Sequence, residues 1–310
     1  MAKLLHWCMA IFCKTPIAHF FHPQMSTSFD ISKTRFRTKK LARRIAVFIG
    51  RIIRLWPQTH TPCIRVITYH RFGYSALDPV CVAPENFREQ LAWLRTNATI
   101  LTPRHFELIM SGQCVAPKNA VLITIDDGHK SIFDHALPAL DEQHISAVLF
   151  VCPGLIEAVA ARDRIVPATL ANWDDLKQAH AMGHEIAPHG MSHRSLGRMP
   201  FSNAIDEIRT AKTLLNTRLG VRTPFFSFPF GTLADYSTSL ASALEAEGFR
   251  FNFTSTHGRC LPGTPTTLLP RLKIENGEDK NLFIHIVKGY MDHWCIVDRL
   301  LFPFQQRGMM

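Results

Sequence analysis

The stretch AVLITIDDG at residues 120–128 carries the strongest local signal in the chain. An apolar run leads straight into two carboxylates, Asp126 and Asp127, and then into a turn glycine, Gly128. This pattern predicts a buried strand that ends in a polar turn. Two adjacent carboxylates at such an end are costly unless a positive charge, such as a divalent metal, neutralises them. Taken alone, the motif also fits an ordinary turn in which an Asp caps the next helix.

Strand-like runs alternate with helix-like segments from residue 63 onward. Strands are predicted at 64–69, 120–125, 147–151, 185–188, 225–228, 251–254 and 268–274. Helices are predicted at 84–95, 104–110, 131–143, 173–182, 203–219, 237–247 and 280–290, with Asn172 and Ser202 as N-caps. The alternation is typical of a parallel sheet, open or closed, and about seven strands in one domain favour a barrel.

A second polar motif, HGMSH, follows the predicted strand at 185–188 and contributes His189 and His193. Neutral imidazoles are good ligands for zinc and related metals. The spacing alone is weak, because 16 His in 310 residues produce about one such pair by chance. A second pair, His180 and His184, spans a predicted helix end and is interpreted as structural. His189 and His193 differ because they enter a polar loop after a strand, where barrel sites form.

A third motif, Phe228-Pro229-Phe230-Gly231, stands at another predicted strand end. Together with the Asp-Asp end and the histidine pair about sixty residues later, it resembles the polysaccharide deacetylase family. This is the family with the NodB homology domain, carbohydrate esterase family 4. The resemblance covers about residues 64–274 and includes WDDL at 173–176 and GHEI at 183–186. It implies an α/β fold, a distorted (β/α) barrel with fewer strands than eight.

The resemblance implies a catalytic metal centre at the strand ends. Asp126 would be the catalytic base, and Asp127, His189 and His193 would bind a divalent metal. Two imidazoles and one carboxylate suit zinc, with cobalt, nickel or manganese as alternatives. Three protein ligands leave an open position for water and substrate. The expected enzyme is a metal-dependent hydrolase acting on non-peptide C–N bonds.

The resemblance also implies an oxyanion site and a general acid. The backbone N–H of Phe230, flanked by Pro229 and Gly231, would receive the oxyanion. The run 65–71, RVITYHR, looks like the acid-bearing strand of a permuted branch of the family, which assigns the acid to His70. The alternative for His70 is a core histidine beside the site.

The sequence departs from the commonest family pattern at three places. The strand at 268–274 carries no His, and the family's Asp-x-x-Asp-Trp segment is missing after Gly231. The arginine that normally orients the base is absent before Pro229, and Arg222 lies too early in the chain. Arg271, on a later strand, is the candidate replacement.

The expected reaction is removal of the N-acetyl group from an N-acetylhexosamine in a polysaccharide, an oligosaccharide or a lipid-linked precursor. One alternative is deacylation of another amide, such as a formylated amino sugar or a small cyclic amide. A carbohydrate-binding pseudoenzyme is another. A nucleic-acid partner is not expected, because the basic residues cluster in the N-terminal segment and no recognition motif occurs.

Residues 1–62 form a basic amphipathic segment that precedes the deacetylase-like domain of residues 63–310. Its core, residues 39–56, predicts a helix with one apolar face, ended by Pro57. Two interpretations remain open: contact with a membrane interface, favoured by the net charge of +10, or a barrel cap with its basic face in water. An apolar run at residues 4–12 only loosely resembles a signal peptide, and Met25 could be the true start. We therefore expect a cytoplasmic protein or one peripheral to the inner membrane face, with export as the alternative.

The 8 scattered Cys contain no C-x-x-C pair. We interpret them as small buried apolar residues, because a chain of 310 residues needs no disulfide framework.

Overall fold

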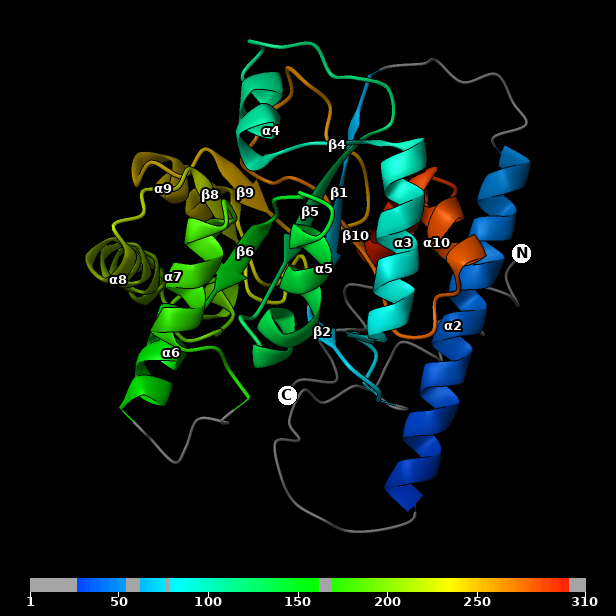
Figure 1. Ribbon diagram of the computed structural model, residues 1–310, viewed down its shortest axis with the longest axis horizontal. Helices are drawn as coiled ribbons and strands as arrows, with labels where there is room; N and C mark the ends of the chain where they lie inside the picture. The colour runs from blue at the N-terminus through cyan, green and yellow to red at the C-terminus, as the bar shows by residue number, and fades with distance from the viewer. Residues whose placement is uncertain (1–26, 54–61, 76–77, 162–168, 301–310) are drawn as a thin grey trace.

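The computed structural model describes residues 27–53, 62–75, 78–161 and 169–300 (Figure 1). The barrel wall consists of β1 (Ile64–Tyr69), β5 (Ala120–Ile125), β6 (Val148–Val151), β7 (Glu185–Pro188), β8 (Phe225–Ser227), β9 (Phe251–Phe253) and β10 (Leu272–Lys273). Parallel ladders join β10, β1, β5, β6 and β7 in that order, and join β8 to β9. The prediction of an α/β barrel with about seven strands is confirmed.

The barrel closes unevenly around its circumference. β9 reaches the chain just before β10 through a parallel bridge between Phe253 and Leu269, where Thr254 N donates to Leu269 O at 2.9 Å. On the other side β7 and β8 are neighbours, yet the described residues form no ladder between them. The wall is therefore interrupted beside the histidine motif.

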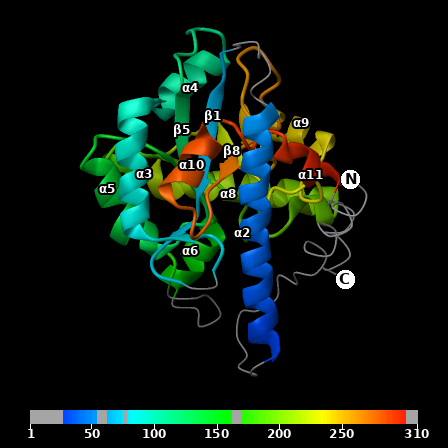
Figure 2. The same ribbon diagram turned by 90° about the vertical axis from the view of Figure 1, so that its right-hand side faces the viewer.

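Helices cover the outside of the barrel (Figures 1 and 2). They are α2 (Thr27–Ile53), α3 (Pro84–Asn97), α4 (Pro103–Met110), α5 (Leu137–Asp141), α6 (Pro153–Ala160), α7 (Trp173–Ala181), α8 (Phe201–Leu219), α9 (Thr238–Ala246), α10 (Lys280–Val287) and α11 (Trp294–Leu300). Short strands β2 (Arg71–Phe72) and β3 (Cys81–Val82) pair with each other, and β4 (Thr99–Ile100) pairs with β5. None of the described helices is long and apolar enough to cross a bilayer.

Three local predictions about helices need correction. The helix expected at 131–143 is a π-helical turn, Ile132–Ala136, that leads into the short α5, since Pro138 has no N–H for a regular ladder. Ser202 is not an N-cap, because the helix already begins at Phe201 after Pro200. Helices α6 and α11 were not predicted from the sequence. The Asn172 cap is confirmed: its side chain accepts from two backbone N–H groups of α7 in a capping box.

Side chains alternate between the inside and the outside of the barrel wall. Ile64, Val66 and Leu122 belong to an apolar interior cluster, whereas Ile67 and Ile123 pack under the helices. The same alternation along β5 directs Thr124 and then Asp126 inward. The interior is apolar toward the amino ends of the strands and polar toward their carboxyl ends.

Helix α2 lies along the flank of the barrel. Its orientation contradicts the interpretation of a cap whose apolar face packs on the barrel and whose basic face lies in water. Arg43, on the predicted basic face, is buried at 2% exposure, together with Ala46 and Val47. The apolar residues Ile45 and Phe48 are exposed instead, at 42% and 62%. Ion pairs with the domain hold Lys39 and Arg43 inward, so these basic residues do not face water, whereas Arg44 and Arg51 are exposed. Trp56 and Pro57 lie outside the described residues, and the boundary at residue 62 stays a prediction.

Candidate active site

The polar motifs meet at one end of the barrel. His70 follows β1, Asp126 and Asp127 follow β5, and His189 follows β7. Because the strands are parallel, their carboxyl ends share one rim, and turns at this rim bring distant motifs together. The structure therefore brings together the first two motifs as the sequence analysis expected.

Asp126 is held inside the barrel by Arg271. The arginine is fully buried and the carboxylate is 2% exposed. Arg271 Nη1 donates to Asp126 Oδ1 at 2.8 Å and Nη2 donates to Oδ2 at 2.7 Å, a bidentate pair. Burial alone would raise the pKa of Asp126, but the Arg271 charge outweighs it and the pKa is lowered. Asp126 is therefore an ionised carboxylate in a dry environment.

Asp127, His189 and His193 offer three ligand atoms that all lie within 4.8 Å of one another. His189 Nε2 is 3.6 Å from Asp127 Oδ1, and His193 Nε2 is 3.2 Å from the same oxygen. Asp127 Oδ1 is buried, and neither contact has hydrogen-bond geometry, so the oxygen has no donor among the described residues. A buried carboxylate oxygen faced by two imidazole nitrogens fits a divalent cation bound between them.

The backbone at this rim adopts left-handed conformations at three non-glycine residues. The φ angles are 76° at Asp127, 56° at His193 and 62° at Phe230. Such conformations are uncommon for side-chain-bearing residues and persist only where the surrounding structure enforces them. All three residues belong to the motifs that the sequence singled out. The left-handed turns therefore cost some folding free energy and set the direction of these three residues.

The ring orientation of His189 is fixed from behind. Its Nδ1 lies 2.8 Å from Ser227 O, so Nδ1–H donates to the carbonyl and the Nε2 lone pair faces Asp127. Burial lowers the pKa of His189 to about 4, which keeps the ring neutral at pH 7. A neutral imidazole with a free Nε2 is the form that binds a metal.

His70 lies at the same rim with its Nδ1 buried and without a hydrogen-bond partner among the described residues. Burial lowers the pKa of His70, and the charges of Asp127 and Asp126 act in the opposite direction. Phe230 packs its ring edge-on against His193, with centroids 4.7 Å apart. Within the described residues the Phe230 N–H is not used by a backbone carbonyl, which leaves it available as a donor.

The turn after β8 lies very close to two neighbouring segments of the chain. Gly231 has a φ of 63°, and a Cβ there would lie 2.6 Å from Ser255 N. Pro229 packs against Gly190, where an added Cβ would meet Pro229 Cγ at 3.1 Å. The two glycines let the Pro-Phe-Gly turn fit between the histidine loop and the chain after β9.

Comparison with known proteins agrees with this geometry. The family model for polysaccharide deacetylase matches residues 115–250. The poly-beta-1,6-N-acetyl-D-glucosamine N-deacetylase of Staphylococcus epidermidis is 23% identical over 211 residues, covering 66% of this chain and 71% of that protein. The chain is thus similar to the polysaccharide deacetylase family in sequence over residues 115–250 and in fold.

Two solved structures of deacetylases share the fold. The Streptococcus pyogenes deacetylase PplD superposes with a TM-score of 0.64 at 19% identity, covering 72% of this chain and 97% of that one. IcaB from Ammonifex degensii superposes with a TM-score of 0.61 at 22% identity, covering 74% and 97%. At these identities the likeness speaks for the barrel architecture alone.

A residue behind the histidine loop was not predicted from the sequence. Glu207, on α8, accepts from Met191 N at 2.9 Å, Ser192 N at 3.0 Å and Ser192 Oγ at 2.6 Å. It is therefore bonded to the turn that separates the two histidines. No sequence signal marks it, because a glutamate on an amphipathic helix is ordinarily a solvated side chain.

The other histidine pair has a structural role, as expected. His184 is 2% exposed, and its Nδ1 accepts from Ala147 N at 3.1 Å. Burial lowers the pKa of His184 to about 4, so it stays neutral and ties the residue before β6 to the residue before β7. The cysteines among the described residues are all free, but the prediction that they are buried holds only for Cys81, Cys152 and Cys260, whereas Cys114 is exposed.

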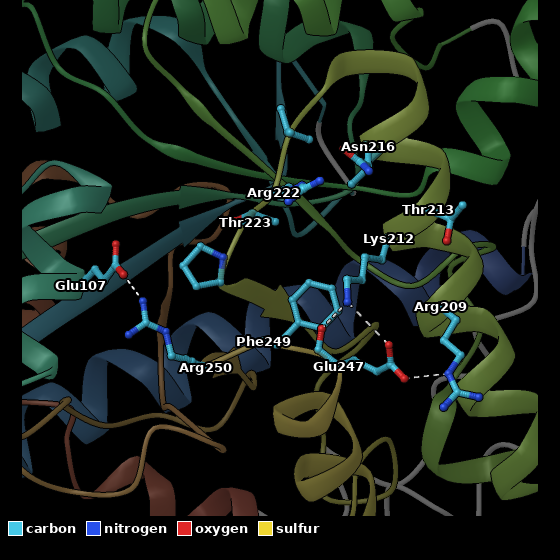
Figure 3. A pocket seen from close by; sticks show the side chains of 14 residues that line it. Glu107, Arg209, Lys212, Thr213, Asn216, Arg222, Thr223, Glu247, Phe249 and Arg250 are labelled. Atoms are coloured by element: carbon cyan, nitrogen blue, oxygen red, sulfur yellow. Dashed lines mark hydrogen bonds and ion pairs between the residues drawn. The ribbon is translucent and has the colours of Figure 1, made fainter.

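A cavity among the described residues lies away from this site (Figure 3). It measures about 890 Å³ and is lined by residues that precede β8 and β9, including Arg222 and Arg250, so it opens at the amino ends of the strands. Figure 3 shows Arg250 directed at Glu107, and Arg209 at Glu247. Arg209 and Arg250 are therefore paired with carboxylates. The cavity lies at the amino-terminal end of the barrel strands, where residues ordinarily serve stability. Arg222 is thus remote from Asp126, as its early position implied.

Proposed function

We propose that this protein removes the N-acetyl group from an N-acetylhexosamine unit by metal-dependent hydrolysis. The observation that carries the proposal is one rim with three ligand atoms for a metal and a separate ionised carboxylate, Asp126, held by Arg271. Similarity to the polysaccharide deacetylase family supports a carbohydrate deacetylase. The metal dependence and the acetamide substrate are inferences from the site.

Asp127, His189 and His193 are the ligands that we assign to the metal. A bound divalent cation would polarise the amide carbonyl and lower the pKa of water at the open position. Zinc suits two imidazoles and one carboxylate best, with cobalt, nickel and manganese as alternatives. Because Ser227 O fixes the ring of His189 and Glu207 is bonded to the loop, the protein supplies these ligands in a preorganised arrangement.

Asp126 is the base in this proposal. Its carboxylate lies 3.9 Å from His189 Nε2, next to the ligands yet bound by Arg271. The Arg271 guanidinium keeps the pKa of Asp126 low and fixes both oxygens, so the carboxylate stays ionised and correctly aimed. It would accept the proton of the attacking water.

His70 and the Phe230 N–H complete the chemistry. A donor at Phe230, aimed by its left-handed backbone, would stabilise negative charge on the former carbonyl oxygen. His70, whose Nδ1 has no partner within the described residues, would protonate the departing amine. Burial lowers the pKa of His70 although Asp127 and Asp126 act to raise it, so the acid role rests on the position of the ring at the rim and not on its titration.

The substrate class rests on a coarser argument. The curated relative from Staphylococcus epidermidis is named for poly-beta-1,6-N-acetyl-D-glucosamine. We carry over only the N-acetylated amino sugar, because pocket walls differ between relatives while the chemistry at the metal is shared. A polysaccharide, an oligosaccharide and a lipid-linked precursor all present this group.

The test is acetate release from N-acetylglucosamine oligomers by the purified full chain, with added zinc or with a chelator. Zinc-dependent release by the wild type, lost in Asp126→Asn although metal analysis finds the metal still bound, is the expected result. Release that persists in the chelator would remove the metal from the proposal. Stoichiometric metal without acetate release would instead favour another amide or a sugar-binding pseudoenzyme.

A further inference from the structure

The docking of α2 leaves a continuous apolar surface pointing away from the protein. Arg43 is anchored inward: its Nε donates to Glu278 Oε1 at 2.6 Å and its Nη2 to Lys273 O at 2.9 Å. Lys39 pairs with Glu275 at 2.7 Å. Farther along the helix, Gly50 faces the backbone of Tyr290 so closely that a Cβ would lie 1.6 Å from its carbonyl oxygen. These contacts fix which side of α2 faces outward.

The outward side carries an unbroken apolar stripe. Its members recur at helical spacing and are exposed by 41–62%: Leu41, Ile45, Phe48, Ile49 and Ile52. At 1.5 Å per residue the stripe is about 16 Å long. Single exposed apolar residues are ordinary, but a contiguous stripe on a rigidly held helix marks an interaction surface. Figure 2 shows α2 in front of the barrel, uncovered by other labelled elements.

A row of arginines borders this stripe. Arg37, Arg44 and Arg51 are exposed and recur every seven residues, which returns to nearly the same side of a helix. At 100° per residue the row lies along the edge next to Phe48. Arg44 pairs with Asp279 at 3.2 Å, whereas Arg37 and Arg51 form no ion pair with another of the described residues, so their charges can act on a partner. Apolar and cationic side chains therefore share one exposed strip.

We propose that this strip of α2 docks the protein on an anionic lipid surface. An interfacial helix inserts its apolar stripe at the boundary between head groups and acyl chains, while the flanking arginines contact anionic head groups. A second copy of the chain is the other candidate. Two copies would bring identical arginine rows together, and each carries a net charge of +10, so their electrostatics oppose pairing. The same charge attracts an anionic membrane.

The proposal implies an orientation for the catalytic domain. Helix α2 runs along the side of the barrel (Figures 1 and 2), so docking by its outer face would lay the barrel on its side. The rim with Asp126 and His189 would then open across the membrane surface. This orientation suits glycans carried at that surface, but the docking itself is independent of the deacetylase activity.

The experiment is co-sedimentation of the full chain with vesicles of phosphatidylcholine alone or mixed with phosphatidylglycerol. The informative variant is Ile45→Ser/Phe48→Ser, and the matched control is Phe201→Ser, which alters an equally exposed apolar residue on α8. We expect binding to the mixed vesicles, weakened about tenfold or more by the double variant and unchanged in the control. Arg51→Gln should weaken binding about fivefold at low salt and less at high salt.

Several outcomes would overturn the proposal. Wild-type protein that stays in solution with both kinds of vesicle would do so, as would equal binding by the wild type and the double variant. Sedimentation velocity decides the competing occupant: a dimer that Ile45→Ser/Phe48→Ser abolishes, without vesicle binding, would assign the strip to self-association. Matching thermal melts of the variants and the wild type exclude a folding defect as the cause.

Discussion

Replacing Arg271 with Met tests the central pair of the site. The variant leaves the Asp126 carboxylate buried at 2% exposure without its bidentate partner. Loss of one member of a buried ion pair costs about 3–5 kcal/mol of unfolding free energy. For a domain of this size that corresponds to a fall in Tm of roughly 10 °C. The variant should therefore fold but melt earlier.

The more specific expectation concerns pH. The Arg271 charge now holds the pKa of Asp126 below its ordinary value, against the effect of burial. Without that charge burial dominates, and the pKa of Asp126 should rise above its ordinary value. Protonated Asp126 cannot act as a base, so the acid limb of kcat/KM should move to higher pH by the same amount.

The sign of the stability effect follows from the same shift. In the wild type the lowered pKa of Asp126 contributes stability above the unfolded value of 3.8, and this is lost as pH falls through the folded pKa. In Arg271→Met the raised pKa reverses the effect, so the unfolding free energy should improve relative to the wild type between pH 7 and pH 5. Acetate release across pH measures the shift of the acid limb, and thermal melts at two pH values measure the change in stability.

An unmoved acid limb in the variant would refute the assignment of Arg271 to Asp126 as its orienting partner. Arg271→Lys, which keeps the charge but not the two parallel bonds, is the matched control and should give an intermediate shift.

Four further results are expected. His189→Ala should lose the metal while the barrel stays folded, whereas Asp126→Asn should keep it, as metal analysis after gel filtration can show; retained metal in the first would contradict the ligand set. His70→Ala should lower kcat by about 10²–10⁴-fold with the metal still bound, because the leaving amine loses its acid, and a normal rate would place the acid elsewhere. Glu207→Gln should weaken metal affinity by about 10–100-fold, through the loosened loop between the histidines, in a competition titration with a chelator. Gly50→Ala should force α2 away from Tyr290, so its Tm should fall while a Phe48→Ser control keeps the wild-type value.

Local patterns in the sequence were sufficient for the strands and for the residues at their ends. A wall strand that is buried on both faces is a continuous apolar run in the sequence, so the wall segments were predicted to within a few residues. The Asp-Asp and histidine motifs are equally local, and parallel strands bring their carboxyl ends to one rim. The π-helical turn before Pro138 shows the limit of this reasoning, because an apolar period does not reveal how one missing N–H is accommodated.

The contacts that complete the site belong to the tertiary structure. Arg271 and Asp126 are 145 positions apart, and they meet because the sheet places β10 beside β1 and β1 beside β5. The bonds from Glu207 to the histidine loop and from His189 to Ser227 O arise in the same way. The sequence by itself determined that α2 has a basic and an apolar side. Glu275 and Glu278, more than two hundred positions away, decide which side of α2 faces the protein. Burying the charge of Arg43 is favourable only where the fold supplies carboxylate partners for it.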